Sequence, residues 1–146
     1  MSNLNKIQLA KEKLEQLISS REDKLQTMMK TASILTELLE PVSRIDGYPI
    51  VVGGLSVEIY TQSDYTTRDI DFVTSSSDAL SKLLLQIGFK KEGRIYYHED
   101  IEVVVDIVSS ALEGSYEKVV HLQLEDGSKI YVISYRRYHS RSLTCI

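Results

Sequence analysis

Several features are scarce in this chain, and each scarcity excludes a class of protein. The only cysteine is Cys145, which excludes an internal disulfide and a cysteine-based zinc site. So little cysteine is typical of a reducing, cytoplasmic compartment. No apolar run approaches the roughly 20 residues that span a bilayer, and the N-terminus lacks the apolar core of a signal peptide. We therefore expect no membrane association.

Net charge of one sign is also small. The formal net charge is −4 and the isoelectric point is near 5.4, which gives no overall attraction to nucleic acid. A chain of 146 residues with 42% hydrophobic and 26% charged residues is typical of one folded domain. We divide it into an N-terminal helical segment (1–44), a core (45–133) and a short tail (134–146).

Two amphipathic helices are predicted in the N-terminal segment. The first spans 3–19, and the second starts with Ser20 as its N-cap and runs to about Glu40, where Pro41 ends it. One continuous helix is the alternative, although Arg21 interrupts the apolar stripe. We expect the stripe to pack on the domain; the alternatives are a partner protein or a homo-oligomer joined through these helices.

Short strands and helices alternate in the predicted core. The expected elements are strand 50–52, helix 55–61, loop 62–67, strand 69–73, helix 77–87, strand 94–97, turn 98–100, strand 101–108, and strands 116–124 and 128–133. The buried face of helix 77–87 is expected to comprise Ala79, Leu80, Leu83, Leu84 and Ile87, with Gly88 ending the helix. The last two strands are expected to form a hairpin through a type I′ turn at Asp126-Gly127, and a short helix is expected from Ser134.

Three aspartates stand out because of their setting in predicted strands. Asp69 and Asp71 lie two residues apart, so they project from the same face of a strand, where their charges repel each other. Asp106 lies in the apolar run 103–108, where an ionised carboxylate needs a partner. Three converging carboxylates suit one or two Mg²⁺ ions, because this cation prefers oxygen ligands.

A glycine pair precedes the first two of these acids. Gly53 and Gly54 follow an apolar strand and lead into a helix, so their backbone N–H groups are candidates to bind a phosphate. Ser56 adds a hydroxyl in the first turn of that helix. Arg68 is a candidate to contact a phosphate, and a salt bridge with Asp69 or Asp71 is the alternative. A simple tight turn is the alternative for the glycine pair.

The order of these motifs resembles the polymerase-β-like nucleotidyltransferase superfamily. The matching residues are Val52-Gly53-Gly54, then Asp69-Ile70-Asp71, then Asp106 on a later strand. The segment Thr67-Arg68-Asp69-Ile70-Asp71-Phe72 looks more narrowly like the minimal bacterial enzymes of the AbiEii toxin type. The resemblance covers about residues 48–108 and leaves the N-terminal helices unexplained.

The resemblance implies an α+β nucleotidyltransferase fold, with a mixed sheet and helices packed on one side. It implies transfer of a nucleoside monophosphate from an NTP to a hydroxyl, with Mg²⁺ held by Asp69, Asp71 and Asp106. Gly53, Gly54 and Ser56 would hold the β- and γ-phosphates, and Asp106 would help to deprotonate the acceptor. The acceptor is left open among transfer RNA, a protein and a small molecule. A toxin of a toxin–antitoxin or phage-defence system is the implied context, with an antitoxin protein as partner.

The chain departs from larger family members because it ends soon after Ile133, without their C-terminal helical region. We therefore expect a minimal form or a site completed by a partner. The basic cluster Lys90, Lys91 and Arg94 would meet a triphosphate or an RNA, or is solvated surface. His98 in a predicted turn, His121 and His139 have no metal-site spacing. A catalytically inactive module acting through a protein partner, and a structural dimer with exchanged helices, are the alternatives to an enzyme.

Overall fold

The computed structural model describes residues 3–20, 23–40, 45–61, 69–111 and 119–133. The helices within these ranges are α1 (Asn3–Ser20), α2 (Lys24–Leu39), α3 (Gly53–Thr61) and α4 (Ser77–Gln86), with the 3₁₀ helix η1 (Ile45–Gly47). The strands are β1 (Ile50–Val52), β2 (Asp69–Val73), β3 (Lys90–Glu92), β4 (Ile95–His98), β5 (Val103–Ser109), β6 (Val119–Gln123) and β7 (Lys129–Ile133). The α+β class is confirmed. No helix in the described ranges is long and apolar enough to cross a bilayer.

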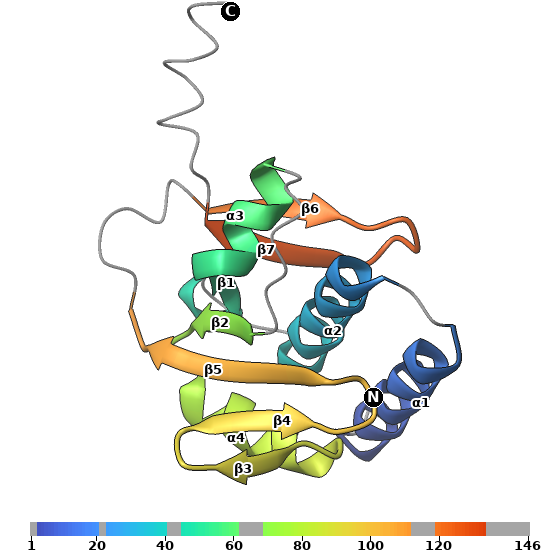
Figure 1. Ribbon diagram of the computed structural model, residues 1–146. Coiled ribbons are helices and arrows are strands. Elements are labelled where there is room, and N and C mark those ends of the chain that lie inside the picture. Colours follow the sequence, from blue (N-terminus) through green and yellow to red (C-terminus); the bar gives the residue numbers. More distant parts are fainter. Residues whose placement is uncertain (1–2, 21–22, 41–44, 62–68, 112–118, 134–146) are drawn as a thin grey trace, which may run out of the picture.

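The strands form one mixed sheet in the order β3-β4-β5-β2-β1-β7-β6 (Figure 1). Strand β2 pairs with β5, and β1 with β7, in parallel, whereas the other neighbours are antiparallel. The strands β2 and β5, which carry the three aspartates of interest, are therefore adjacent near the middle of the sheet. This adjacency joins motifs that are more than 30 residues apart in the sequence.

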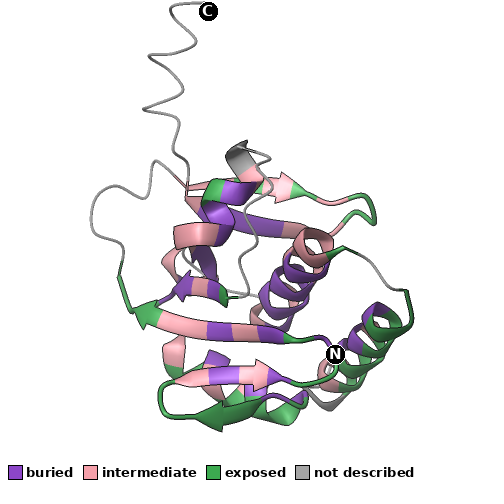
Figure 2. Cartoon of the chain, viewed as in Figure 1, coloured by how far each residue is buried: buried purple, intermediate pink, exposed green. Residues whose placement is uncertain are grey.

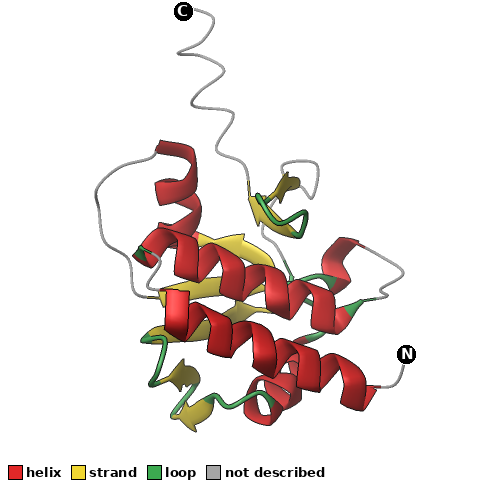
Figure 3. Cartoon of the chain, turned by 90° about the vertical axis from the view of Figure 1, so that its right-hand side faces the viewer, coloured by secondary structure: helices red, strands yellow, loops and turns green. Residues whose placement is uncertain are grey.

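One face of the sheet packs against the helices, which gather in front of the strands in Figure 3. Ile70, Phe72 and Val105 are fully buried and belong to a core that also includes residues of all four helices. Because side chains alternate along a strand, Asp71 and Asp106 project from the opposite face. The helices pack on the side of the sheet where the apolar side chains of β2 and β5 lie. The opposite face, which carries Asp71 and Asp106, is free of these helices.

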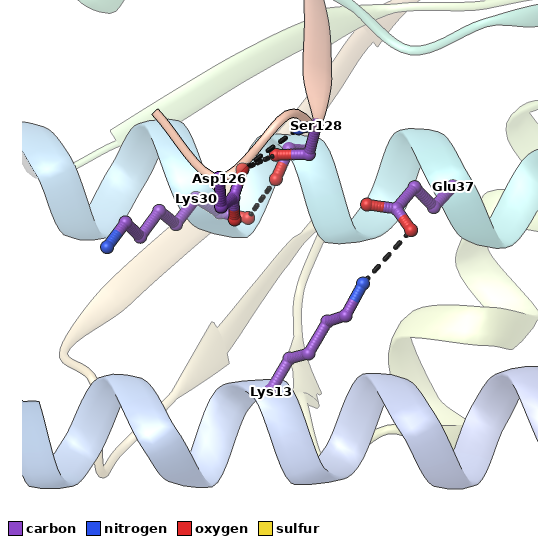
Figure 4. Close-up of polar contacts among 6 residues, drawn as sticks. Lys13, Lys30, Glu37, Asp126 and Ser128 are labelled. Carbon is purple, nitrogen blue, oxygen red and sulfur yellow. Dashed lines mark hydrogen bonds and ion pairs between the residues drawn. The ribbon is translucent and has the colours of Figure 1, made fainter. Parts of the chain in front are cut away.

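The two N-terminal helices pack on their own domain, as expected. Met28, Ala32 and Leu35 of α2 are fully buried, and Figure 2 shows α1 buried along one side only. Lys13 of α1 forms an ion pair with Glu37 of α2 at 3.0 Å (Figure 4). Because α2 supplies part of the core, removal of residues 1–40 would disrupt the fold.

The ends of the helices are fixed by specific hydrogen bonds. The N-cap of α2 is Asp23, whose side chain accepts from the N–H of Gln26 at 2.8 Å. The prediction of Ser20 as this cap was wrong, since the Ser20 hydroxyl donates back to the Leu17 carbonyl within α1. At the end of α4, Gly88 has φ of +111°, and the N–H of Phe89 donates to the Leu84 carbonyl at 3.0 Å, which completes the predicted glycine cap.

Other predicted boundaries needed correction. Helix α3 begins at Gly53 and not at Leu55, so both glycines lie in its first turn. Strand β3 was not predicted, because its three residues are all exposed and lack an apolar pattern. His98 belongs to β4 and is buried, and β5 starts at Val103, because Glu102 has φ of +55° and interrupts the extended backbone. Ala79, expected in the core, is exposed.

The β6–β7 hairpin is present, but its turn differs from the prediction. A type I′ turn needs positive φ at both central residues, and in this turn only Gly127 has it, at +89°. The N–H of Leu124 donates to the Ser128 carbonyl, and the N–H of Gly127 donates to the Leu124 carbonyl. This is a longer turn closed by a glycine bulge. The predicted tail helix, His139, Cys145 and the loop 62–67 lie outside the described residues.

Candidate active site

Two aspartates come together on the sheet face that the helices leave free. Asp71 of β2 and Asp106 of β5 are register partners, so their side chains project side by side. We refer to Asp71 and Asp106 as the acid pair. Asp69 is the register partner of Val104, one step along the same face, and it is exposed. The structure therefore brings the three predicted carboxylates to one face, with two of them directly adjacent.

The acid pair is electrostatically unfavourable by itself. Burial raises the pKa of Asp71, and the neighbouring charges of Asp106 and Asp69 raise it further. Arg94 partly offsets this rise. Oδ1 of Asp106 is buried and has no hydrogen-bond partner among the described residues. An unpaired buried polar atom is costly, so Oδ1 could accept a cation or a donor from outside the described residues.

The glycine pair lies directly against the acid pair. Val52 is the register partner of Asp71, and Gly53 follows it at the start of α3. Gly53 has φ of +70°, and a Cβ at this position would lie 2.5 Å from Oδ2 of Asp71. Any side chain here would occupy the space beside the carboxylate, so glycine keeps this space open and lets the backbone approach the acid.

The first turn of α3 adds donors to this space. The leading N–H groups of a helix have no partner within the helix, and together with the helix dipole they favour an anion. Gly54 lies in this turn and carries one such N–H. Ser56 is fully buried, and its hydroxyl donates to the Gly53 carbonyl at 2.8 Å. This hydrogen bond stabilises the first turn of α3. Contact of Ser56 with a phosphate stays a prediction.

Arg94 is the residue whose place in the site the sequence did not reveal. Its Nη2 donates to Oδ2 of Asp106 at 3.0 Å. Lys90 instead pairs with Glu99 at 3.1 Å, and Lys91 lies over the ring of Tyr96. The basic cluster is thus divided among three places. Arg94 reaches Asp106 because its neighbour Ile95 is the register partner of Asp106. This register depends on the pairing of β4 with β5, which the residue pattern alone does not specify.

The carboxylates of the site fit a divalent cation only in a mode that uses few protein ligands. Among the described residues, no three His, Cys, Asp or Glu side chains are grouped so that they could hold a metal ion. However, Mg²⁺ is commonly bound by one or two carboxylates, with substrate phosphates and water as the other ligands. The acid pair fits that mode, as do the open space at Gly53 and Oδ1 of Asp106, which no described residue contacts by a hydrogen bond.

The predicted role of Arg68 stays a prediction, and the described histidines lie apart from the acid pair. Arg68 lies outside the described residues. His98 projects toward the ring of Phe89 on the helix-covered side, with ring centroids 5.2 Å apart, and His121 is exposed on β6. Comparisons of the chain with family models, curated proteins and solved structures found no match.

Proposed function

We propose that the protein is a Mg²⁺-dependent nucleotidyltransferase that transfers a nucleoside monophosphate from an NTP to a hydroxyl group. The observation that supports this most strongly is the arrangement of three residues: Asp71 lies beside Asp106, and Gly53 lies directly against Asp71. A carboxylate pair next to an anion-binding helix start is what metal-assisted phosphoryl chemistry requires. The proposal includes the polymerase-β-like nucleotidyltransferase fold.

Each residue of the site has a distinct role in the proposal. Asp71 and Asp106 would hold one or two Mg²⁺ ions, and Asp69 would add negative charge beside them on the same face. When bound, Mg²⁺ supplies charge neutralisation at the triphosphate and at the leaving pyrophosphate. Gly53 and Gly54 would direct backbone N–H groups to the β- and γ-phosphates, and these donors would offset the repulsion between the phosphates and the neighbouring carboxylates.

The carboxylate of Asp106 also accepts the proton of the acceptor hydroxyl. The hydroxyl oxygen then attacks the α-phosphorus, a new P–O bond forms, and the bond to the β-phosphate oxygen breaks with release of pyrophosphate. Oδ1 of Asp106 supports this role, because it accepts no hydrogen bond from any described residue and is therefore available to accept a proton. The acceptor is an RNA, a protein or a small molecule, and the biological setting that we propose is the toxin of a toxin–antitoxin or phage-defence system.

Label transfer tests the proposal. Incubation of the protein with each α-labelled NTP, Mg²⁺ and cellular RNA, protein or small-molecule extract should label one acceptor class. Asp71→Asn and Asp106→Asn should abolish labelling, whereas Asp78→Asn, an exposed aspartate at the start of α4, should leave it unchanged. Labelling that survives in both site variants would contradict the proposed role of the acid pair.

A second candidate is a binding module without catalytic activity, which acts through a protein partner such as a toxin. Two observations favour it: Arg94 already pairs with Asp106, and the described acids do not form a group of three. Isothermal titration calorimetry separates the two candidates. The enzyme should bind Mg²⁺ together with an NTP, and the module should bind neither.

A further inference from the structure

Arg94 lies at the rim of the acid pair and reaches it from the turn between β3 and β4. It follows Gly93, which has φ of +63°, and no atom of the described part of the chain would lie within 4 Å of a Cβ added there. The Arg94 side chain is 75% exposed, whereas the Asp106 side chain is 17% exposed. The aspartate is thus fixed in the sheet, and the arginine approaches it from a solvated turn.

The contact is electrostatically useful and easily broken. The guanidinium neutralises part of the charge that Asp71 and Asp106 place side by side. An ion pair with one highly exposed partner contributes little net free energy, because solvent screens it and the long side chain loses freedom. Arg94 can therefore leave Asp106 at small cost when another cation takes over the neutralisation.

A metal ion and Arg94 would compete for the same carboxylate. Oδ2 of Asp106 already accepts from Arg94, while Oδ1 has no partner among the described residues. A divalent cation at the acid pair would repel the guanidinium. A triphosphate at the glycine turn would offer that guanidinium several oxygens in the forked geometry that arginine binds well.

We propose that Arg94 exchanges partners: it neutralises the acid pair in the free protein and moves to the triphosphate when metal and nucleotide bind. This inference rests on the proposed function. Arg94 would then contribute to nucleotide binding, and it would weaken the binding of metal when no nucleotide is present. The two roles predict effects of opposite sign, which a merely structural role would not produce.

The test compares Arg94→Gln with the control Lys91→Gln. Lys91 is a cation of the same hairpin, but its Nζ lies over the ring of Tyr96, 5.8 Å from the ring centroid. Mn²⁺ alone is titrated and followed by electron paramagnetic resonance. Arg94→Gln should bind Mn²⁺ about two- to fivefold more tightly than the wild type, because the competing cation is gone. It should also bind α,β-methylene NTPs with Mg²⁺ roughly tenfold more weakly, because charge-assisted bonds to phosphate are lost. Lys91→Gln should change neither affinity.

The outcomes separate this inference from the proposed function. Equal affinities in the wild type, Arg94→Gln and Lys91→Gln would overturn the partner exchange while leaving the proposed function standing. Weaker Mn²⁺ binding by Arg94→Gln would also overturn it. A wild type that binds neither Mn²⁺ nor any of the four analogues would overturn both. Arg94→Lys should restore the wild-type Mn²⁺ affinity but only part of the nucleotide affinity, since lysine lacks the forked donors.

Discussion

A Cβ on Gly53 would lie 2.5 Å from Oδ2 of Asp71, so the glycine turn and the acid pair are fitted to one another. The two residues are separated by a helix and by residues that the structure does not describe, and they meet because β1 and β2 pair in antiparallel register. Glycine at this position is needed both for its positive φ and for the space that it leaves beside a carboxylate.

Gly53→Ala should therefore damage the site and the fold together. The φ of +70° strains any L side chain, and the methyl group would collide with Asp71. We expect a loss of about 2–4 kcal/mol in the free energy of unfolding and loss of nucleotide binding. Urea denaturation and calorimetry measure the two effects.

Gly127→Ala is the matched control, because Gly127 also has positive φ, at +89°, but no atom of the described residues lies within 4 Å of its Cβ position. It should cost only about 1 kcal/mol and leave nucleotide binding intact. Equal effects of the two substitutions would contradict the close approach of Gly53 to Asp71.

Asp71→Asn should stabilise the protein while it abolishes activity. Burial and neighbouring carboxylates raise the pKa of Asp71, so the folded state holds this proton more tightly than the unfolded state. Ionised Asp71 therefore lowers the free energy of unfolding, and this loss is complete once the pH lies above the raised pKa of the folded state. At pH 7 we expect a gain on the order of 0.5–1 kcal/mol in urea denaturation. Asp69→Asn, at an exposed position, should give a smaller gain.

His98 should make the stability of the fold sensitive to pH. Burial lowers its pKa, although Asp100 and Glu99 partly oppose this effect, and its Nδ1 has no partner among the described residues. The pKa of His98 in the folded state therefore lies below the unfolded value of about 6.5. The neutral, buried imidazole contributes fully to the free energy of unfolding above pH 6.5, and this contribution is lost as the pH falls through the folded pKa. Denaturation at pH 7.5 and 5.5 should show this loss in the wild type and in His121→Asn. His98→Asn should show less of it.

The cap of α2 offers a test of the helical layer. Asp23→Ala should reduce the free energy of unfolding by about 1 kcal/mol, because the N–H of Gln26 loses its acceptor. Ser76, at the corresponding position of α4, makes no side-chain capping bond, so Ser76→Ala should be nearly neutral. Thermal denaturation of both variants measures the difference, and equal losses would argue against the Asp23 cap.

The sequence predicted the parts of the site that depend on local pattern. Alternation along β2 placed Asp69 and Asp71 on one face, and the apolar run of β5 marked Asp106 as a residue that needs a partner. It could not predict the position of Arg94, because that depends on β3 and on the register of β4 with β5. Strand β3 has no apolar residue to reveal it.

Two of the predictions that failed depend on the backbone conformation of single residues. Glu102 adopts positive φ without being glycine, so the strand expected to start at Ile101 starts at Val103. In the β6–β7 turn, the Asp-Gly pair suggested a type I′ turn, but the structure places positive φ at the glycine alone. Residue type restricts such conformations and does not determine them.

The central claim is that the acid pair and the glycine turn form one cation-binding site. It is tested most directly by adding Mn²⁺ to ¹⁵N-labelled protein and recording which amide signals broaden. The signals of Gly53, Asp71 and Asp106 should broaden first, and Asp106→Asn should need much more Mn²⁺ for the same effect. Broadening that starts elsewhere in the chain, or that is equal in the variant and the wild type, would contradict the claim.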